Sequence, residues 1–170
     1  MAIRDVLRLP VADLLRRPGS KRDDTVEAVL DGLAITPSRV PEGEPVRLDM
    51  HLESVNEGII LTGTVSTTWD GECRRCLRPV RAPLRAELLE VFEGEPTEGE
   101  TRLLDGANID LEPVAREAVL LELPLAPLCR EDCAGLCPEC GAVLDEVQCG
   151  HQTPVTDPRW AALEDVRFED

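Results

Sequence analysis

Seven cysteines, most of them in closely spaced pairs, constrain the fold of this chain more than any other feature. Cys73 and Cys76 form one C-x2-C pair, and Cys137 and Cys140 form a second. The remaining candidate ligands are Cys129, Cys133, Cys149 and His151. Thiolates and imidazoles at such spacings bind structural zinc, which takes four of them in a tetrahedron. Eight ligands therefore predict two closed zinc sites.

The spacing of the ligands favours one division between the two sites. The last four, Cys137, Cys140, Cys149 and His151, lie close together in the sequence and would close a compact local site. Cys129 and Cys133 would then complete the site that Cys73 and Cys76 begin, clamping a helical segment onto the preceding part of the chain. With four protein ligands on each ion, no position stays open for water, which argues against metal-dependent hydrolysis.

Three other uses of the cysteines remain open. Iron–sulfur clusters bind to the same kinds of cysteine pair, and only metal analysis separates them from zinc. Disulfides are disfavoured because the number of cysteines is odd and no apolar segment has signal-peptide or membrane-spanning length, which predicts a cytoplasmic protein with reduced thiols. A redox pair at Cys73 and Cys76 would be expected at a helix N-terminus, whereas here the pair joins two predicted strands.

Three segments alternate apolar and polar residues with the period of a half-buried strand. They span residues 46–53, 59–70 and 80–88, and short connections join them. Asn56 to Gly58 has the composition of a hairpin turn. Pro83 cannot donate a ladder hydrogen bond, so we expect the third strand at a sheet edge or a bulge. These segments predict an antiparallel meander.

Helical segments are expected before and after these strands in the sequence. Apolar residues from Leu111 to Leu121 recur at helical spacing after Asp110, which can cap a helix. Residues 10–17 could form one or two helical turns, Asp157 can open a short helix over 158–163, and 94–106 reads as an exposed loop. The fold class predicted is α+β, with a domain over 1–128 and a cysteine-rich zinc segment with its C-terminal helix over 129–170.

The charge is strongly negative but unevenly spread. A formal net charge of −16 argues against a general nucleic-acid coat, because binding to phosphates depends on clustered lysines and arginines. Basic residues gather in 1–22 and in 71–86. The second cluster holds the candidate RNA- or partner-binding residues Arg74, Arg75, Arg78, Arg81 and Arg85. A simpler explanation, that the acidic residues only maintain solubility, also remains open.

Other chemistry-bearing residues give weaker signals. His51 belongs to the polar side of its strand and is expected in solvent, while Trp69 and Trp160 are expected in the core or at a docking surface. Two phenylalanines and no tyrosine leave little from which to build a base-stacking platform. The sequence contains no recognisable nucleophile–base pair, phosphate loop or catalytic carboxylate pair, so we expect no enzymatic activity.

Several of these motifs together resemble the YceD family of large ribosomal RNA subunit accumulation proteins. The motifs are the stretch from Glu72 to Pro79, the run from Leu123 to Gly141, and the closing stretch from Asp157 to Leu163. The resemblance implies that Cys73, Cys76, Cys129 and Cys133 form one unit and that the later ligands form an accessory site. His151 departs from similar members, which often have a cysteine there.

The resemblance also implies a function. It points to a non-catalytic ribosome-biogenesis factor with structural zinc that supports accumulation or processing of large-subunit ribosomal RNA. The expected partner is this RNA or a precursor particle, without a membrane. The alternative is an acidic interaction protein or chaperone for a basic large-subunit ribosomal protein, which the net charge favours.

Overall fold

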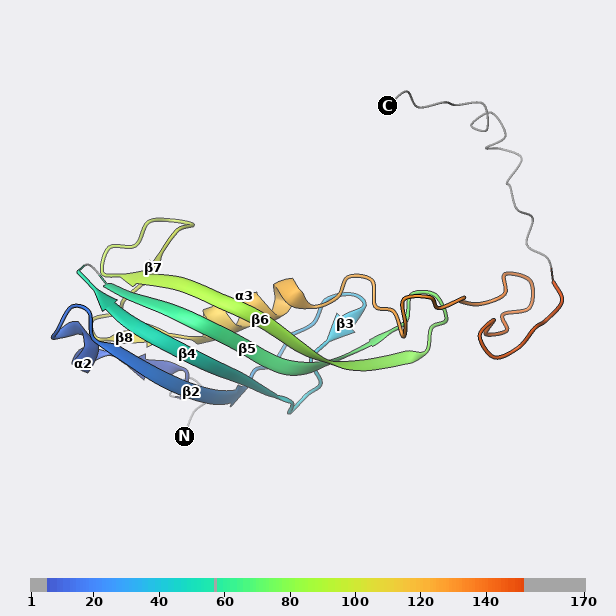
Figure 1. The fold of residues 1–170 in the computed structure, drawn as a ribbon, viewed down its shortest axis with the longest axis horizontal. Helices are drawn as coiled ribbons and strands as arrows, with labels where there is room; N and C mark the ends of the chain where they lie inside the picture. Colours follow the sequence, from blue (N-terminus) through green and yellow to red (C-terminus); the bar gives the residue numbers. More distant parts are fainter. Residues whose placement is uncertain (1–5, 57, 152–170) are drawn as a thin grey trace, which may run out of the picture.

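A long, twisted antiparallel sheet forms the centre of the computed structural model, which describes residues 6–56 and 58–151 (Figure 1). Strands β4 (Pro45–Val55), β5 (Gly58–Glu72) and β6 (Pro79–Glu93) follow one another as an antiparallel meander. The three strands and their order confirm the prediction, and each strand is longer than its sequence pattern indicates. The hairpin turn predicted at Asn56 to Gly58 includes Glu57, which is outside the described residues.

Further strands extend this sheet at its margins. β2 (Lys21–Val29) pairs along β4, and β3 (Ser38–Arg39) pairs with the end of β5. β7 (Arg102–Leu103) lies parallel to the end of β6, within the segment predicted as a loop, so that prediction is wrong for these two residues. Two more strands, β1 (Arg8–Pro10) and β8 (Asn108–Asp110), form a separate ribbon.

The alternation along the strands leaves one sheet face buried and the other facing solvent. Leu48, Leu61 and Leu88 are among the buried side chains, and all belong to one core cluster. Trp69 joins this cluster at 9% exposure, as predicted for a core residue. Helix α3 (Glu112–Glu122) packs against β6 and β5 (Figure 1). The molecule is mainly β-sheet with helices packed on it, which agrees with the predicted α+β class.

The predicted helix starts are close to the observed ones. The short helix α2 (Ala12–Leu15) lies within the predicted 10–17 segment. Asp110 Oδ1 accepts a hydrogen bond of 3.0 Å from the N–H of Glu112, so its side chain caps α3 as expected, although Leu111 takes the N-cap position. The predicted helix at 158–163, with Trp160, lies outside the described residues.

The outer side of β6 is an open sheet edge for most of its length. Pro83 pairs with Thr68 of β5, and β6 pairs on its other side, within 6–56 and 58–151, only with β7 at Phe92 and Glu93. Pro83 is therefore at an edge, as predicted from its missing N–H.

The β5–β6 hairpin projects beyond the first residues of β4. Its strands stay paired as far as Glu72 and Pro79, so residues 73–78 form the hairpin tip. Figure 1 shows this tip at the end of the molecule away from the β1–β8 ribbon, with the cysteine-rich segment beside it. The fold thus places the first C-x2-C pair far from the N-terminal ribbon. The proposed division into domains at residue 128 stays a prediction.

Within the described part of the chain, no helix has both the length and the apolar character needed to cross a membrane.

Candidate metal centre

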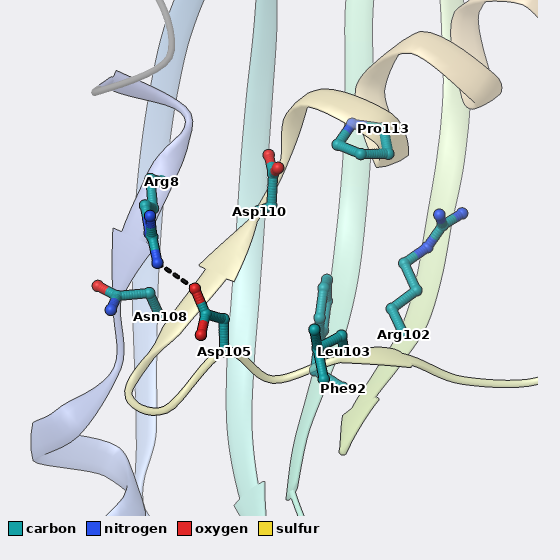
Figure 2. A pocket seen from close by; sticks show the side chains of 8 residues that line it. All are labelled: Arg8, Phe92, Arg102, Leu103, Asp105, Asn108, Asp110 and Pro113. Atoms are coloured by element: carbon teal, nitrogen blue, oxygen red, sulfur yellow. Dashed lines mark hydrogen bonds and ion pairs between the residues drawn. The ribbon is translucent and has the colours of Figure 1, made fainter. Parts of the chain in front are cut away.

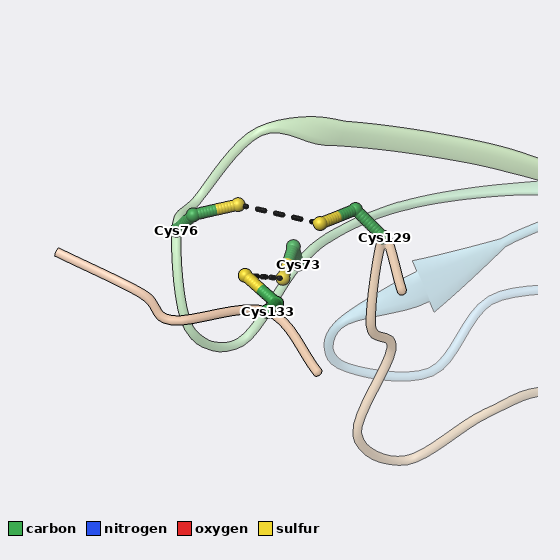
Figure 3. Close-up of side chains that lie close together, drawn as sticks. All are labelled: Cys73, Cys76, Cys129 and Cys133. Carbon is green, nitrogen blue, oxygen red and sulfur yellow. Dashed lines mark hydrogen bonds between the residues drawn. The ribbon is translucent and has the colours of Figure 1, made fainter. Parts of the chain in front are cut away.

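Four cysteine sulfurs meet at the hairpin tip and form the first group. Cys73 and Cys76 come from the tip, and Cys129 and Cys133 come from the segment after α3; their sulfurs all lie within 4.8 Å of one another (Figure 3). The Sγ atoms of Cys73 and Cys133 are 3.8 Å apart, and those of Cys76 and Cys129 are 3.7 Å apart. A distant part of the chain therefore completes a site that the hairpin begins.

The sulfur separations in the first group fit a tetrahedral zinc ion. Zinc–sulfur bonds of about 2.3 Å in a tetrahedron place the sulfurs roughly 3.8 Å apart. The donor set consists of thiols, the ligands that closed structural zinc sites favour. Cys73, Cys76 and Cys133 are buried and Cys129 is exposed. With four protein sulfurs in place, such an ion would have no position left for water.

A tight turn at the hairpin tip aims both sulfurs inward. The N–H of Leu77 donates to the carbonyl of Cys73 at 2.8 Å, and the N–H of Cys73 donates to the carbonyl of Arg78 at 2.8 Å. Leu77 has a φ of 59°, the one left-handed non-glycine residue in the described ranges. That conformation costs a non-glycine residue of order 1 kcal/mol or more, so the surrounding contacts must hold the turn.

Hydrogen bonds from the tip to main-chain carbonyls attach the segment after α3 to the tip. The N–H of Arg74 donates to the carbonyl of Pro127 at 2.9 Å. The guanidinium of Arg75 donates to the carbonyl oxygens of Glu131 and Cys133, at 3.1 and 2.8 Å. These contacts bring Cys133 close to Cys73.

The electrostatic surroundings favour the thiolate at two of the four positions. A hydrogen bond from the N–H of Cys76 lowers the pKa of Cys73 to about 6. The guanidinium of Arg78 lowers the pKa of Cys76, and the sulfur in turn raises the pKa of Arg78. Burial raises the pKa of Cys133 to about 12. A divalent cation deprotonates a coordinating thiol outright, so the buried Cys133 can still serve as a thiolate ligand.

A second group of possible ligands forms within residues 137–151. Cys137, Cys140, Cys149 and His151 bring their ligand atoms within 4.8 Å of one another, and Cys137 Sγ is 3.7 Å from His151 Nδ1. Mixed sulfur and nitrogen ligands on tetrahedral zinc would be about 3.6 Å apart, given bond lengths near 2.3 and 2.1 Å. The donor set therefore suits zinc here too.

The local turn of the second group resembles that of the first. The N–H of Gly141 donates to the carbonyl of Cys137 at 2.9 Å, and Gly141 has a φ of 72°, which favours glycine. The N–H of Cys140 lowers the pKa of Cys137 to about 6. Cys137 is buried, whereas Cys140 and His151 are exposed. The second group is thus more open to solvent than the first.

The two groups in the structure are the same two sets of four that the sequence spacing favours. His51 is in neither group. It lies on the solvent face of the sheet, where its Nδ1 atom is 2.6 Å from Asp23 Oδ1 and its side chain is 42% exposed. That either group binds a metal ion remains a proposal.

The five arginines predicted as one contact patch have different surroundings. Arg75 and Arg78 make the contacts described above, and Arg81 Nη2 is 2.7 Å from Glu44 Oε2. Arg74 and Arg85 are exposed and make no salt bridge with the residues the structure describes. Within the described residues, Arg74 and Arg85 are also the two of the five whose side chains make no hydrogen bond.

Sequence reasoning missed two acidic residues near the first group, Asp145 and Glu146. Glu146 Oε1 accepts a hydrogen bond of 2.6 Å from Arg78. The side chain of Asp145 is only 7% exposed; burial acts to raise its pKa, but the N–H of Ala134 and the charge of Arg130 outweigh that effect and the pKa is lowered. In the sequence these residues look like ordinary surface acids, and no spacing signal links them to Arg78.

A pocket of about 460 Å³ lies at the other end of the sheet, beside β8, β7 and the start of α3 (Figure 2). Its charged groups already have partners. Arg8 pairs with Asp105, and Arg102 pairs with Glu90 and Glu117, each at 2.7 Å. The cysteine groups are therefore the stronger candidates for a functional site.

The family of the chain follows from comparison with known sequences. A family model described as "Large ribosomal RNA subunit accumulation protein YceD" matches residues 61–167, more than half of the chain. The chain belongs to the YceD family. The matched range includes all eight cysteine and histidine ligands of the two groups. Both groups are therefore part of the YceD region, and the resemblance noted in the sequence is confirmed.

Relatives of this YceD chain occur in several bacteria. An uncharacterised protein of Mycobacterium tuberculosis is 42% identical over 168 residues, which cover 92% of this chain and 79% of the relative. The uncharacterised protein YlbN of Bacillus subtilis is 27% identical over 153 residues, which cover 87% of this chain and 88% of YlbN. No solved structure matches the chain.

Proposed function

We propose that this YceD protein is a non-catalytic ribosome-biogenesis factor that supports accumulation or processing of large-subunit ribosomal RNA, with structural zinc in both cysteine groups. The observation that carries the proposal is the family match, whose description names large ribosomal RNA subunit accumulation and whose range includes both groups. The family name implies the RNA; the zinc and the absence of catalysis are inferences from the residues.

The structural role for zinc rests on how completely the protein supplies the ligands. Each group offers four ligand atoms within 4.8 Å of one another, which fills a tetrahedron. In the first group the ligands come from two segments more than fifty residues apart, so a bound ion would act as a cross-link. Binding of this kind contributes directly to folding free energy. The ion would fix the hairpin tip rather than activate a substrate.

Arg74 and Arg85 are the residues best suited to contact RNA phosphates. Both are exposed, and neither makes a salt bridge within the described ranges. Two arginines make a small electrostatic footprint, since each neutralised phosphate adds only one released counterion to the affinity. Direct contact through these two arginines would therefore be weak on its own and would mainly orient the protein on a larger particle.

The net negative charge supports the alternative, a chaperone for a basic ribosomal protein. The solvent face of the sheet is itself of mixed charge, since its acidic residues Asp23, Glu27, Asp49 and Glu87 lie beside the basic residues Lys21, Arg47, Arg81 and Arg85. Three of the five candidate arginines are already engaged by acidic or main-chain groups of the same chain. A net charge of −16 would attract a basic partner over long range.

Complementation of a strain that lacks the protein tests the proposed function. We expect the ratio of mature large-subunit to small-subunit ribosomal RNA to fall in this strain, and the wild-type chain to restore it. Arg74→Glu with Arg85→Glu should restore it only in part. The matched control is Arg16→Glu with Arg17→Glu, two exposed arginines at the other end of the molecule, which should restore it fully. An unchanged ratio in the strain without the protein would contradict the proposal.

Recovery of partners with and without nuclease separates the two candidates. Nuclease-sensitive recovery of large-subunit ribosomal RNA supports contact with RNA or a precursor particle. Recovery of one basic ribosomal protein that survives nuclease supports the chaperone alternative.

A further inference from the structure

The Arg78 side chain contacts the first cysteine group through two of its sulfurs. Its Nε atom donates to Cys76 Sγ at 3.4 Å, and its Nη2 atom lies 4.0 Å from Cys129 Sγ. Among the lysines and arginines that the structure describes, only Arg78 donates to a cysteine sulfur. One of these sulfurs belongs to the hairpin tip and the other to the segment after α3, so Arg78 spans the junction between them.

The other side of the same guanidinium contacts the loop of residues 141–148, which joins Cys140 to Cys149 in the second group. Arg78 Nη1 donates to Glu146 Oε1 at 2.6 Å, and Arg78 Nη2 is 3.8 Å from Asp145 Oδ2. A single side chain therefore contacts ligands of the first group and the loop whose two ends the second group holds.

The 141–148 loop is itself packed against the first group. Asp145 Oδ1 accepts a hydrogen bond of 3.3 Å from the N–H of Ala134 and a further one from Arg130. The N–H of Leu144 donates to the carbonyl of Gly135 at 3.0 Å. Asp145 Oδ2 is buried and has no hydrogen-bond partner among the described residues, so the nearby charge of Arg78 compensates it.

We propose that Arg78 is a positioning residue that couples the two cysteine groups. This inference rests on the proposed zinc role. Four thiolates around a divalent cation carry a net charge of −2, which a guanidinium in hydrogen-bond contact offsets. Asp145 and Glu146 hold that guanidinium in place, and closure of the second group holds the loop that carries them. An ordered second group therefore strengthens zinc binding by the first group.

In this arrangement Arg78 stabilises its own chain, although its charge suggests contact with RNA or a partner. Its donors are directed to sulfurs and carboxylates of its own chain, and its side chain is 39% exposed. Because coupling between two binding sites is reciprocal, the first group strengthens the second by the same factor. Zinc binding at either group then raises the zinc affinity of the other.

The zinc affinity of the first group tests the role of Arg78. It is measured on the purified chain by competition with a chromophoric chelator at fixed pH. Loss of a side chain that orients ligands from outside the coordination sphere typically weakens metal binding by about 10- to 100-fold, and we expect this for Arg78→Gln. Arg85→Gln is the matched control, an arginine of β6 without a contact to sulfur in the described ranges, and should leave the affinity unchanged.

Milder variants separate charge from geometry and guard against misfolding. Arg78→Lys keeps the charge but not the planar fork, so its affinity should lie between those of the wild type and Arg78→Gln. Glu146→Gln leaves the sulfur contacts intact and should weaken the first group by a smaller factor in the same direction. Equal affinities for Glu146→Gln, Arg78→Gln and Arg85→Gln would overturn the proposal.

A double-mutant comparison tests the coupling itself. Cys140→Ser with Cys149→Ser disables the second group, and we expect a several-fold weaker first group. Adding Arg78→Gln to this background should cost less than it does in the wild type, because the loop no longer holds the guanidinium. If the loss of zinc affinity in the combined variant equals the product of the two separate losses, the coupling is refuted. A wild-type chain that binds no zinc would instead overturn the proposed metal role, so the two failures are distinguishable.

Discussion

At the scale of single residues, the two cysteine groups differ in how far they are shielded from solvent. The first group has three buried ligands and one exposed ligand, Cys129, whereas the second has one buried ligand, Cys137, and exposes Cys140 and His151. Solvent, chelators and oxidants reach an exposed thiol more readily than a buried one. The first group should therefore exchange its ion slowly and the second group faster.

Single cysteine variants should separate the two groups. Cys140→Ser should remove one zinc ion and leave the hairpin tip resistant to protease, because the first group keeps all four ligands. Cys73→Ser should lose the zinc of the first group and expose the tip and the 129–133 segment to cleavage. Native mass spectrometry and limited proteolysis measure both effects. Loss of all bound zinc in Cys140→Ser would show that the groups are not separate sites.

At the scale of elements, the sheet follows from the alternation along its strands. Leu88 and Leu89 are neighbours on β6 but point to opposite faces, with 5% and 73% of the residue surface exposed. Side chains alternate between the two faces of a strand, so here one leucine lies in the core and the next leucine in solvent. This pair offers a direct test of which face is buried.

Truncation of each leucine in turn provides that test. Leu88→Ala should lower the free energy of unfolding by about 2–5 kcal/mol, because it leaves a cavity in the core. Leu89→Ala should change it by less than about 0.5 kcal/mol, because its side chain is already in solvent. Urea unfolding monitored by the fluorescence of the buried Trp69 measures both values. Equal losses for the two variants would contradict the assignment of Leu88 to the core and Leu89 to solvent.

The predictability of each strand depends on how much of its pattern is local. β4, β5 and β6 could be located from sequence because each carries its own apolar alternation. β2 could not, since Val26 and Ala28 are its main inward apolar residues and charged side chains fill much of the strand. β7 has two residues, and only its pairing with Phe92 and Glu93 makes it a strand. Such elements are specified by their neighbours and not by their own residues.

At the scale of the whole molecule, the chain is a long sheet, and the segment after α3 packs against the tip of its projecting β5–β6 hairpin. The ligand sets could be predicted because C-x2-C pairs and their spacing are visible in the sequence. The arginine patch could not be resolved in the same way, because Arg78 and Glu146 are 68 positions apart and only folding brings them together. A charge is visible in a sequence, whereas its partner usually is not.

The metal content of the chain, purified from its native host, tests the central claim most directly. Elemental analysis combined with X-ray absorption at the zinc edge gives both the number of ions and their ligands. We predict two zinc ions per chain, one bound by four sulfur ligands and the other by three sulfur ligands and one nitrogen ligand, with zinc–sulfur distances near 2.3 Å. A chain that carries no metal, or that carries iron with inorganic sulfide, would contradict the account.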